Sequence, residues 1–130
     1  WWRAQFGLRT MPQVDNGSGL SRSARVSADS LEALLQHAAV SPHAQHFELS
    51  LPLAGVNGTA RGLAWRRPDS TAIGRARIKT GSLRDVRALA GYVFGDSGQT
   101  YVVVAMVNHE RAEQTRDALD RLLEWAVQDQ

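Results

Sequence analysis

Two stretches of the chain carry hydrophobic side chains at helical spacing. The period appears over about residues 28–39, and Ser27 directly before this stretch is a good N-cap. It returns from Glu110 onward and predicts a closing amphipathic helix. The recurring positions are Leu31, Leu34, Leu35 and Ala38 in the first stretch and Ala112, Thr115, Leu119, Leu122, Leu123 and Ala126 in the second.

Between these helices the pattern changes to that of β-strands. Segments rich in β-branched and apolar residues lie at about 74–80, 88–95 and 100–108, and Asp-Ser-Gly at 96–98 predicts a hairpin turn. Strands joined by short turns pair antiparallel, so we expect an α+β fold with a three-stranded antiparallel sheet flanked by helices. The stretch 41–70 is rich in turn residues and predicts no regular element. Trp65 and Trp125 are expected to be core or packing residues.

Composition adds few constraints. Residues 1–130 predict one domain, with 43% hydrophobic and 22% charged residues and a net charge of +2. No long basic run is present, so nucleic-acid binding is not expected. The chain has no cysteine, which excludes disulfides and thiolate chemistry. No apolar run approaches the ~20 residues of a membrane span, and no signal peptide is visible.

Lys79 is the only lysine of the chain, and it begins the sequence Lys79-Thr80-Gly81-Ser82 after a predicted strand. A lysine ammonium can share or lose a proton, whereas an arginine guanidinium stays charged. K-T-G after a strand is one of the signatures of the serine enzymes that react with penicillin. A strand that ends in an ordinary Thr-Gly turn would contain the same residues, so further motifs decide between the two interpretations.

Three further motifs occur in a fixed order around K-T-G-S. They are D-x-G-S-G-L-S-R at 15–22, S-L-P-L-A-G-x-x-G-T at 50–59 and L-A-G-Y at 89–92. Together they resemble the C-terminal part of the D-alanyl-D-alanine carboxypeptidase/endopeptidases, the low-molecular-mass class C penicillin-binding proteins. The resemblance implies the penicillin-recognising serine DD-peptidase/β-lactamase-like fold, in which an N-terminal part would supply two more strands and the nucleophile.

The resemblance implies roles for the K-T-G-S residues. Lys79 would provide positive potential, Thr80 would bind the terminal carboxylate of the substrate, and Gly81 would leave room for it. The backbone N–H of Ser82 would be one of two oxyanion-hole donors. Alternatively, Thr80 and Ser82 only satisfy hydrogen bonds at the end of a strand.

Arg22 would face the acidic end of a stem-peptide side chain, since a guanidinium pairs well with a carboxylate. The equally weighted alternative is that it pairs with Asp15 or Asp29 and braces its loop. Asp15, Ser18 and Ser21 are expected to hydrogen-bond turn backbone.

Two other motifs of the resembled family are missing from the chain. Ser-x-x-Lys would need a serine at position 76, which is Ala76, and none of the three asparagines ends a Ser-x-Asn. We therefore expect this chain alone to be inactive. The whole protein would be a serine D-Ala-D-Ala carboxypeptidase that acts on peptidoglycan stem peptides through an acyl-enzyme, binds β-lactam antibiotics and lies in the periplasm or another extracytoplasmic space. The alternative is a non-catalytic module that binds a partner or the cell wall.

An incomplete sheet would leave a strand edge exposed, so we expect association with the N-terminal part or a homodimer. No cofactor and no metal are expected. His43 and His46 stand three residues apart in a predicted loop without a third ligand, which favours solvent-exposed histidines. The spacing of the histidines leaves a Ser-His-Asp triad open, but none lies in a motif.

Overall fold

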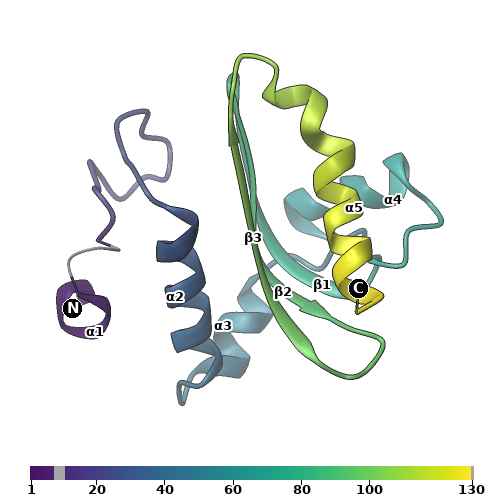
Figure 1. The fold of residues 1–130 in the computed structure, drawn as a ribbon, viewed down its shortest axis with the longest axis horizontal. Coiled ribbons are helices and arrows are strands. Elements are labelled where there is room, and N and C mark those ends of the chain that lie inside the picture. Colours follow the sequence, from purple (N-terminus) through teal and green to yellow (C-terminus); the bar gives the residue numbers. More distant parts are fainter. Residues whose placement is uncertain (8–10, 130) are drawn as a thin grey trace.

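The predicted strands form one antiparallel sheet in the order β1-β2-β3 (Figure 1). The computed structural model describes residues 1–7 and 11–129. Its strands are β1 (Ala76–Leu83), β2 (Val86–Phe94) and β3 (Thr100–Asn108). Only two residues separate β1 from β2, and Leu83 pairs with Val86. β1 therefore runs three residues further than predicted, and K-T-G-S lies inside a paired strand and not at the turn after it.

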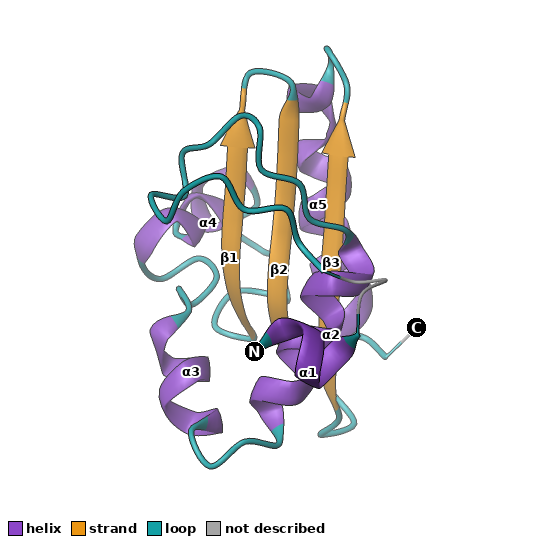
Figure 2. Ribbon diagram, turned by 90° about the vertical axis from the view of Figure 1, so that its left-hand side faces the viewer, coloured by secondary structure: helices purple, strands orange, loops and turns teal. Residues whose placement is uncertain are grey.

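Helices cover both faces of the sheet (Figures 1 and 2). One face packs against α5 and α4, and the other against α2, which also contacts α3. α1 lies on the far side of α2 from the sheet (Figure 1). The helices are α1 (Trp2–Phe6), α2 (Ala28–Ala39), α3 (Ala44–Ser50), α4 (Gly62–Arg66) and α5 (Arg116–Val127), with 3-10 turns η1 (Gly58–Ala60) and η2 (Ala112–Thr115).

The first predicted helix is confirmed in its bounds and its cap. The hydroxyl of Ser27 accepts a hydrogen bond from the backbone N–H of Ser30 at 3.1 Å. The closing helix begins at Arg116 and not near Glu110, because η2 takes up the first turn. The prediction of no regular element over 41–70 is wrong, because α3 and α4 form there. Both are seven residues or shorter, which is too short to show a helical period.

The main hydrophobic core lies between the sheet and α5. It includes Ile78, Leu89, Val93, Leu123 and Val127. Neither Trp65 nor Trp125 is a core residue, because they are 74% and 53% exposed. Trp65 packs instead against the guanidinium of Arg61, which lies 5.3 Å from its ring centroid. Trp125 is two residues from the buried Leu123, a rotation of roughly 200° on a helix, which turns it toward solvent.

Position 91 in the L-A-G-Y motif requires glycine for steric reasons. It pairs with Ile78 across β1 and β2. A Cβ atom at Gly91 would lie 2.1 Å from the carbonyl oxygen of Arg77, so only glycine permits this close approach of the two strands. The same register places Lys79 opposite Ala90 and Thr80 opposite Leu89.

The outer edge of β1 is covered over only part of its length. The backbone N–H of Ala54 donates to the carbonyl of Ala76 at 2.8 Å, and the N–H of Ile78 donates to the carbonyl of Pro52 at 2.9 Å. Beyond Ile78 no described residue pairs with this edge, so K-T-G-S borders an open edge. The outer edge of β3 also carries no strand within the described part of the chain. This agrees with the expected exposed edge, while the homodimer stays a prediction.

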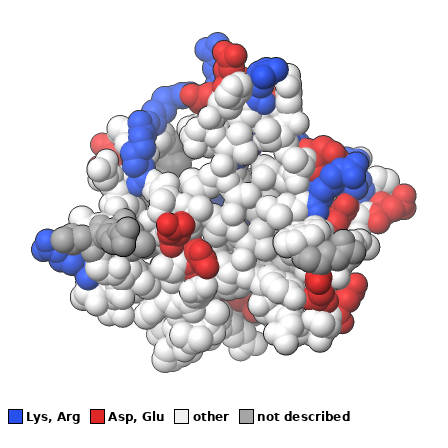
Figure 3. Space-filling view, in the orientation of Figure 1, with Lys and Arg blue, Asp and Glu red and all other residues white. Residues whose placement is uncertain are grey.

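Ion pairs hold α4 against α5. Arg66 donates two hydrogen bonds to the buried carboxylate of Asp120, at 2.8 and 2.9 Å. Arg67 donates two hydrogen bonds to Glu124 and one to Asp117, each at 2.8 Å. Hydrogen bonding to Asp120 raises the pKa of Arg66 above its ordinary value. Figure 3 shows acidic and basic side chains next to each other on the side where α4 and α5 lie.

Candidate active site

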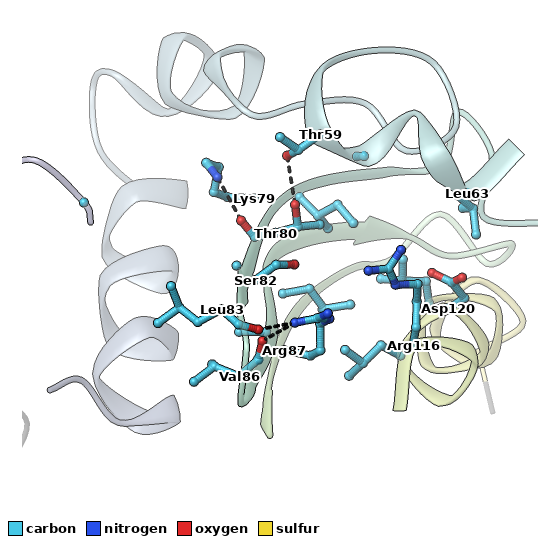
Figure 4. A pocket seen from close by; sticks show the side chains of 18 of the residues that line it. Thr59, Leu63, Lys79, Thr80, Ser82, Leu83, Val86, Arg87, Arg116 and Asp120 are labelled. Atoms are coloured by element: carbon cyan, nitrogen blue, oxygen red, sulfur yellow. Dashed lines mark hydrogen bonds between the residues drawn. The ribbon is translucent and has the colours of Figure 1, made fainter. Parts of the chain in front are cut away.

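A cavity of about 550 Å³ lies along the second half of β1 (Figure 4). Its wall includes all of residues 78–83 on this strand. The loop residues 19–21 contribute to it, as do Thr59 and Ala60 of η1 and several side chains of α5. The cavity thus brings together residues of all four motifs that the sequence analysis singled out, namely those at 15–22, 50–59 and 79–82 and, through Leu89, the one at 89–92.

Successive side chains of β1 point to opposite faces of the sheet, so the K-T-G-S side chains are divided between the two faces. Thr80 and Ser82 share the face of the buried Ile78, which packs toward α5. Lys79 and Gly81 share the opposite face, where Tyr92 of β2 reaches α2 and donates a hydrogen bond to the carbonyl of Leu35. The site is therefore built at the edge of the strand, where groups from both faces can reach the same space.

The backbone of β1 presents its polar groups to the open edge at every second residue. The N–H of Ile78 points away from β2, because it donates to Pro52. In an antiparallel pair this direction repeats with a period of two, so the N–H groups of Thr80 and Ser82 point to the same side. Among the described residues, no backbone group bonds to the N–H of Thr80 or Ser82 at this edge, so both N–H groups are open to a ligand.

Lys79 lies exposed at this edge, and its ammonium donates to the carbonyl oxygen of Thr80 at 2.8 Å. It forms no ion pair with any acidic side chain that the structure describes. Its positive charge therefore stays available to an anionic ligand.

Thr80 and Gly81 both line the cavity. The hydroxyl of Thr80 donates to the hydroxyl of Thr59 at 2.8 Å, and Figure 4 shows the two side chains facing each other. A Cβ atom at Gly81 would meet Ala88 at 3.5 Å, an ordinary van der Waals distance. Internal packing therefore does not demand glycine at position 81, whereas space for a ligand at the edge would.

Three arginines that the sequence did not indicate as site residues line the cavity. Arg87, which pairs with Ser82, is largely buried and donates to the carbonyl oxygens of Leu83 and Val86 at the β1–β2 turn. Arg116 lines the cavity from α5, and Arg66 lines it while paired with Asp120. With Lys79, the lining carries four positive charges against the single carboxylate of Asp120, which suits an anionic ligand. No motif marks these arginines, because they come from separate elements.

Arg22 lies outside the lining of this cavity. Its neighbours Gly19, Leu20 and Ser21 line the cavity, while Arg22 lines a separate cavity of about 320 Å³ with Arg84, Asp85 and Glu110. It forms no ion pair with Asp15 or Asp29 within the described residues. The bracing alternative is therefore not seen, and substrate binding by Arg22 stays a prediction.

The loop before Arg22 holds its shape through its own side chains. Asp15 accepts a hydrogen bond from the hydroxyl of Ser21 at 2.9 Å, and this contact lowers the pKa of Asp15 below its ordinary value. The hydroxyl of Ser18 accepts from the backbone N–H of Leu20 at 3.2 Å. The hydroxyl of Ser21 accepts from the backbone N–H groups of Ser23 and Ala24 at 3.1 and 3.0 Å. The expected bonding to turn backbone is thus seen for Ser18 and Ser21, whereas Asp15 accepts from the side chains of Asn16 and Ser21.

The described residues contain no group of three or more His, Cys, Asp and Glu that could hold a metal ion. His43 precedes α3 and His46 lies within it, and both are exposed. None of the described helices is both long and apolar enough to cross a membrane.

An antiparallel sheet between helices, with K-T-G-S on an open strand edge over a cationic cavity, is the arrangement of the penicillin-recognising serine DD-peptidase and β-lactamase fold. The model of the D-Ala-D-Ala carboxypeptidase 3 (S13) family matches residues 4–128, and the chain belongs to this family.

Individual relatives agree with this assignment. A D-alanyl-D-alanine carboxypeptidase of Actinomadura sp. (strain R39) is 43% identical over 91 residues, which cover 66% of this chain and 16% of the relative. The carboxypeptidase DacB of Haemophilus influenzae is 31% identical over 93 residues, which cover 72% of this chain and 19% of the relative. The chain thus spans less than a fifth of the length of either protein.

Solved structures show the same fold. Penicillin binding protein 4 (dacB) of Haemophilus influenzae, complexed with a β-lactam, superimposes with a TM-score of 0.66 at 26% identity. The superposition covers 83% of this chain and 28% of that chain. The predicted fold class and the family resemblance are both confirmed.

Proposed function

We propose that this chain forms one wall of the active site of a longer serine D-Ala-D-Ala carboxypeptidase/endopeptidase. The observation that carries the proposal is the open edge of β1, where the hydroxyl of Thr80, the N–H of Ser82 and the ammonium of Lys79 meet beside one cavity. Family membership supports the reaction class. The substrate would be a peptidoglycan stem peptide that ends in D-Ala-D-Ala.

The residues of this chain would bind and polarise the substrate. A serine from another part of the protein would attack the carbonyl between the two D-alanines, release the terminal D-alanine and leave an acyl-enzyme for water to hydrolyse. The Ser82 N–H would donate to the oxygen that becomes negative, and one such donor contributes ~3 kcal/mol to lowering the barrier. Thr80 would hold the terminal carboxylate, and Lys79 would supply positive potential.

The same groups would bind β-lactam antibiotics, which also carry a carboxylate beside a reactive carbonyl. The β-lactam complex of the Haemophilus influenzae protein supports this part of the proposal. Because peptidoglycan lies outside the cytoplasmic membrane, the protein would act in the periplasm or another extracytoplasmic space. The rest of the protein would be the partner that covers the open strand edges.

Labelling with fluorescent penicillin tests the proposal. The full-length protein is expected to take up about one penicillin per molecule covalently, because it would contain the serine and lysine that activate each other. The purified 130-residue chain is expected to remain unlabelled, because its sequence has no Ser-x-x-Lys.

Each arm of this experiment has an outcome that contradicts the proposal. Stoichiometric labelling of the 130-residue chain would mean that the nucleophile lies within this chain, and this would contradict the proposal. An unlabelled full-length protein that also releases no D-alanine from D-Ala-D-Ala peptides would leave the non-catalytic binding module as the better account.

A further inference from the structure

Thr59 is the last residue of the motif S-L-P-L-A-G-x-x-G-T. The proposed reaction assigns no role to this motif. Its hydroxyl lies 2.8 Å from the hydroxyl of Thr80, 21 residues further along the chain. Thr59 is exposed and lines the same cavity as Thr80. The contact is therefore at the site itself and not in the core.

The loop that carries Thr59 is held tightly at both ends. Its backbone is fastened to β1 through the hydrogen bond from Ala54 to Ala76, and the side chain of Asn57 accepts from the N–H of Leu53 at 2.8 Å. The N–H of Gly55 donates to the carbonyl of Ala60 at 3.0 Å, which closes the loop around Thr59.

Two glycines of the motif are required for this loop. Gly58, directly before Thr59, has a φ of +53°, and a Cβ atom there would lie 2.9 Å from Pro52. Gly55 has a φ of +72°, and a Cβ atom there would lie 2.8 Å from Ile73. Both positions exclude ordinary side chains. The motif therefore builds a rigid support, and Thr59 is the residue that this support presents to Thr80.

The hydroxyl pair has a consequence for ligand binding. A threonine hydroxyl has one proton and two acceptor lone pairs. The hydroxyl of Thr80 donates its proton to the hydroxyl of Thr59. To donate to a carboxylate, Thr80 must turn this proton to the ligand. A lone pair of the Thr80 oxygen then faces Thr59, which can turn its own proton toward it.

We propose that Thr59 is a positioning residue for Thr80. It holds Thr80 in the rotamer that meets a ligand carboxylate, and it donates a hydrogen bond to Thr80 while Thr80 donates to the bound carboxylate. The inference rests on the proposed function, because it assigns Thr59 to the carboxylate subsite of that enzyme. Thr59 would thereby favour ligands with a free carboxylate without contacting the reacting carbonyl.

A double-mutant cycle in the full-length protein tests this role. Thr59→Val keeps the shape and removes the hydroxyl, and we expect it to lower the second-order rate of acylation by penicillin roughly 2- to 12-fold, the range for one neutral hydrogen bond. Acylation by penicillin methyl ester, which lacks the carboxylate, should change less than 2-fold by the same reasoning. Thr59→Ser should retain the parent rate with penicillin.

The cycle with Thr80→Val separates positioning from a general structural effect. Once Thr80 has no hydroxyl, Thr59→Val should lower the rate little further, because interacting residues are not additive. Thr100→Val, at an exposed position at the start of β3, serves as the matched control and should leave both rates unchanged.

Three outcomes would overturn the inference alone: a Thr59→Val variant as fast as the parent, equal losses with penicillin and its ester, or additive losses in the cycle. If the parent protein reacts with neither compound, the proposed function has failed and the inference fails with it. The parent rate therefore distinguishes the two failures.

Discussion

Replacing Lys79 with alanine in the full-length protein is expected to slow acylation by penicillin by roughly 100-fold or more, the scale of the loss of one preorganised electrostatic contact. The Lys79 ammonium lies at the open edge of β1 and has no carboxylate partner within the described residues. In the proposed function its field would act on the ligand and on the catalytic serine. Second-order acylation rates with fluorescent penicillin measure the effect.

Lys79→Arg should recover little of this loss. The planar guanidinium cannot occupy the place of a compact ammonium that donates to the carbonyl of Thr80. Arg121→Ala removes an exposed positive charge from α5 and serves as the control for net charge, with an expected rate close to that of the parent. An arginine variant that acylates at the parent rate would refute the role given to Lys79.

Thr80→Val is expected to reduce catalytic efficiency on D-Ala-D-Ala peptides by roughly 10- to 150-fold, because a hydrogen bond to a charged group contributes ~1.5–3 kcal/mol. Valine keeps the β-branched shape and the strand propensity, so the melting temperature should change little. The hydroxyl of Thr59 that loses its partner is exposed and can bond to water. Steady-state kinetics with free and amide-capped peptides measure the effect.

The amide-capped peptide is the control for this prediction. It lacks the free carboxylate, so the parent enzyme should already process it poorly and Thr80→Val should reduce its turnover little more. Equal losses on the two peptides, or a variant that melts much earlier than the parent, would make Thr80 a structural strand residue and not a carboxylate-binding one.

The sequence predicted the elements whose patterns repeat. The helix over 28–39 and the strand over 100–108 have the predicted bounds, since each carries a long apolar pattern. α3 and α4 were missed because they are too short to repeat a pattern and are held by tertiary contacts, such as the ion pair from Arg66 to Asp120. The continuation of β1 through K-T-G-S was missed because Thr-Gly is typical of a turn, and only pairing with β2 extends the strand.

The candidate site was predictable where its residues are contiguous. Lys79, Thr80, Gly81 and Ser82 form one motif, and the structure places all four along one cavity. Thr59 was visible at the end of a motif, but its contact with Thr80 depends on a loop fold that local sequence does not reveal. Arg87 and Arg116 could not be predicted, because each approaches the cavity from a different element and neither lies in a motif.

The most direct measurement of the central claim is a crystal structure of the full-length protein after reaction with penicillin. The account predicts a covalent adduct whose carboxylate lies about 2.5–3.0 Å from the Oγ1 atom of Thr80. It also predicts that the carbonyl oxygen of the adduct lies about 2.7–3.1 Å from the backbone nitrogen of Ser82. An unmodified protein, or an adduct whose carboxylate and carbonyl oxygen lie away from Thr80 and Ser82, would contradict the claim that the K-T-G-S edge of β1 is the substrate-binding wall of this enzyme.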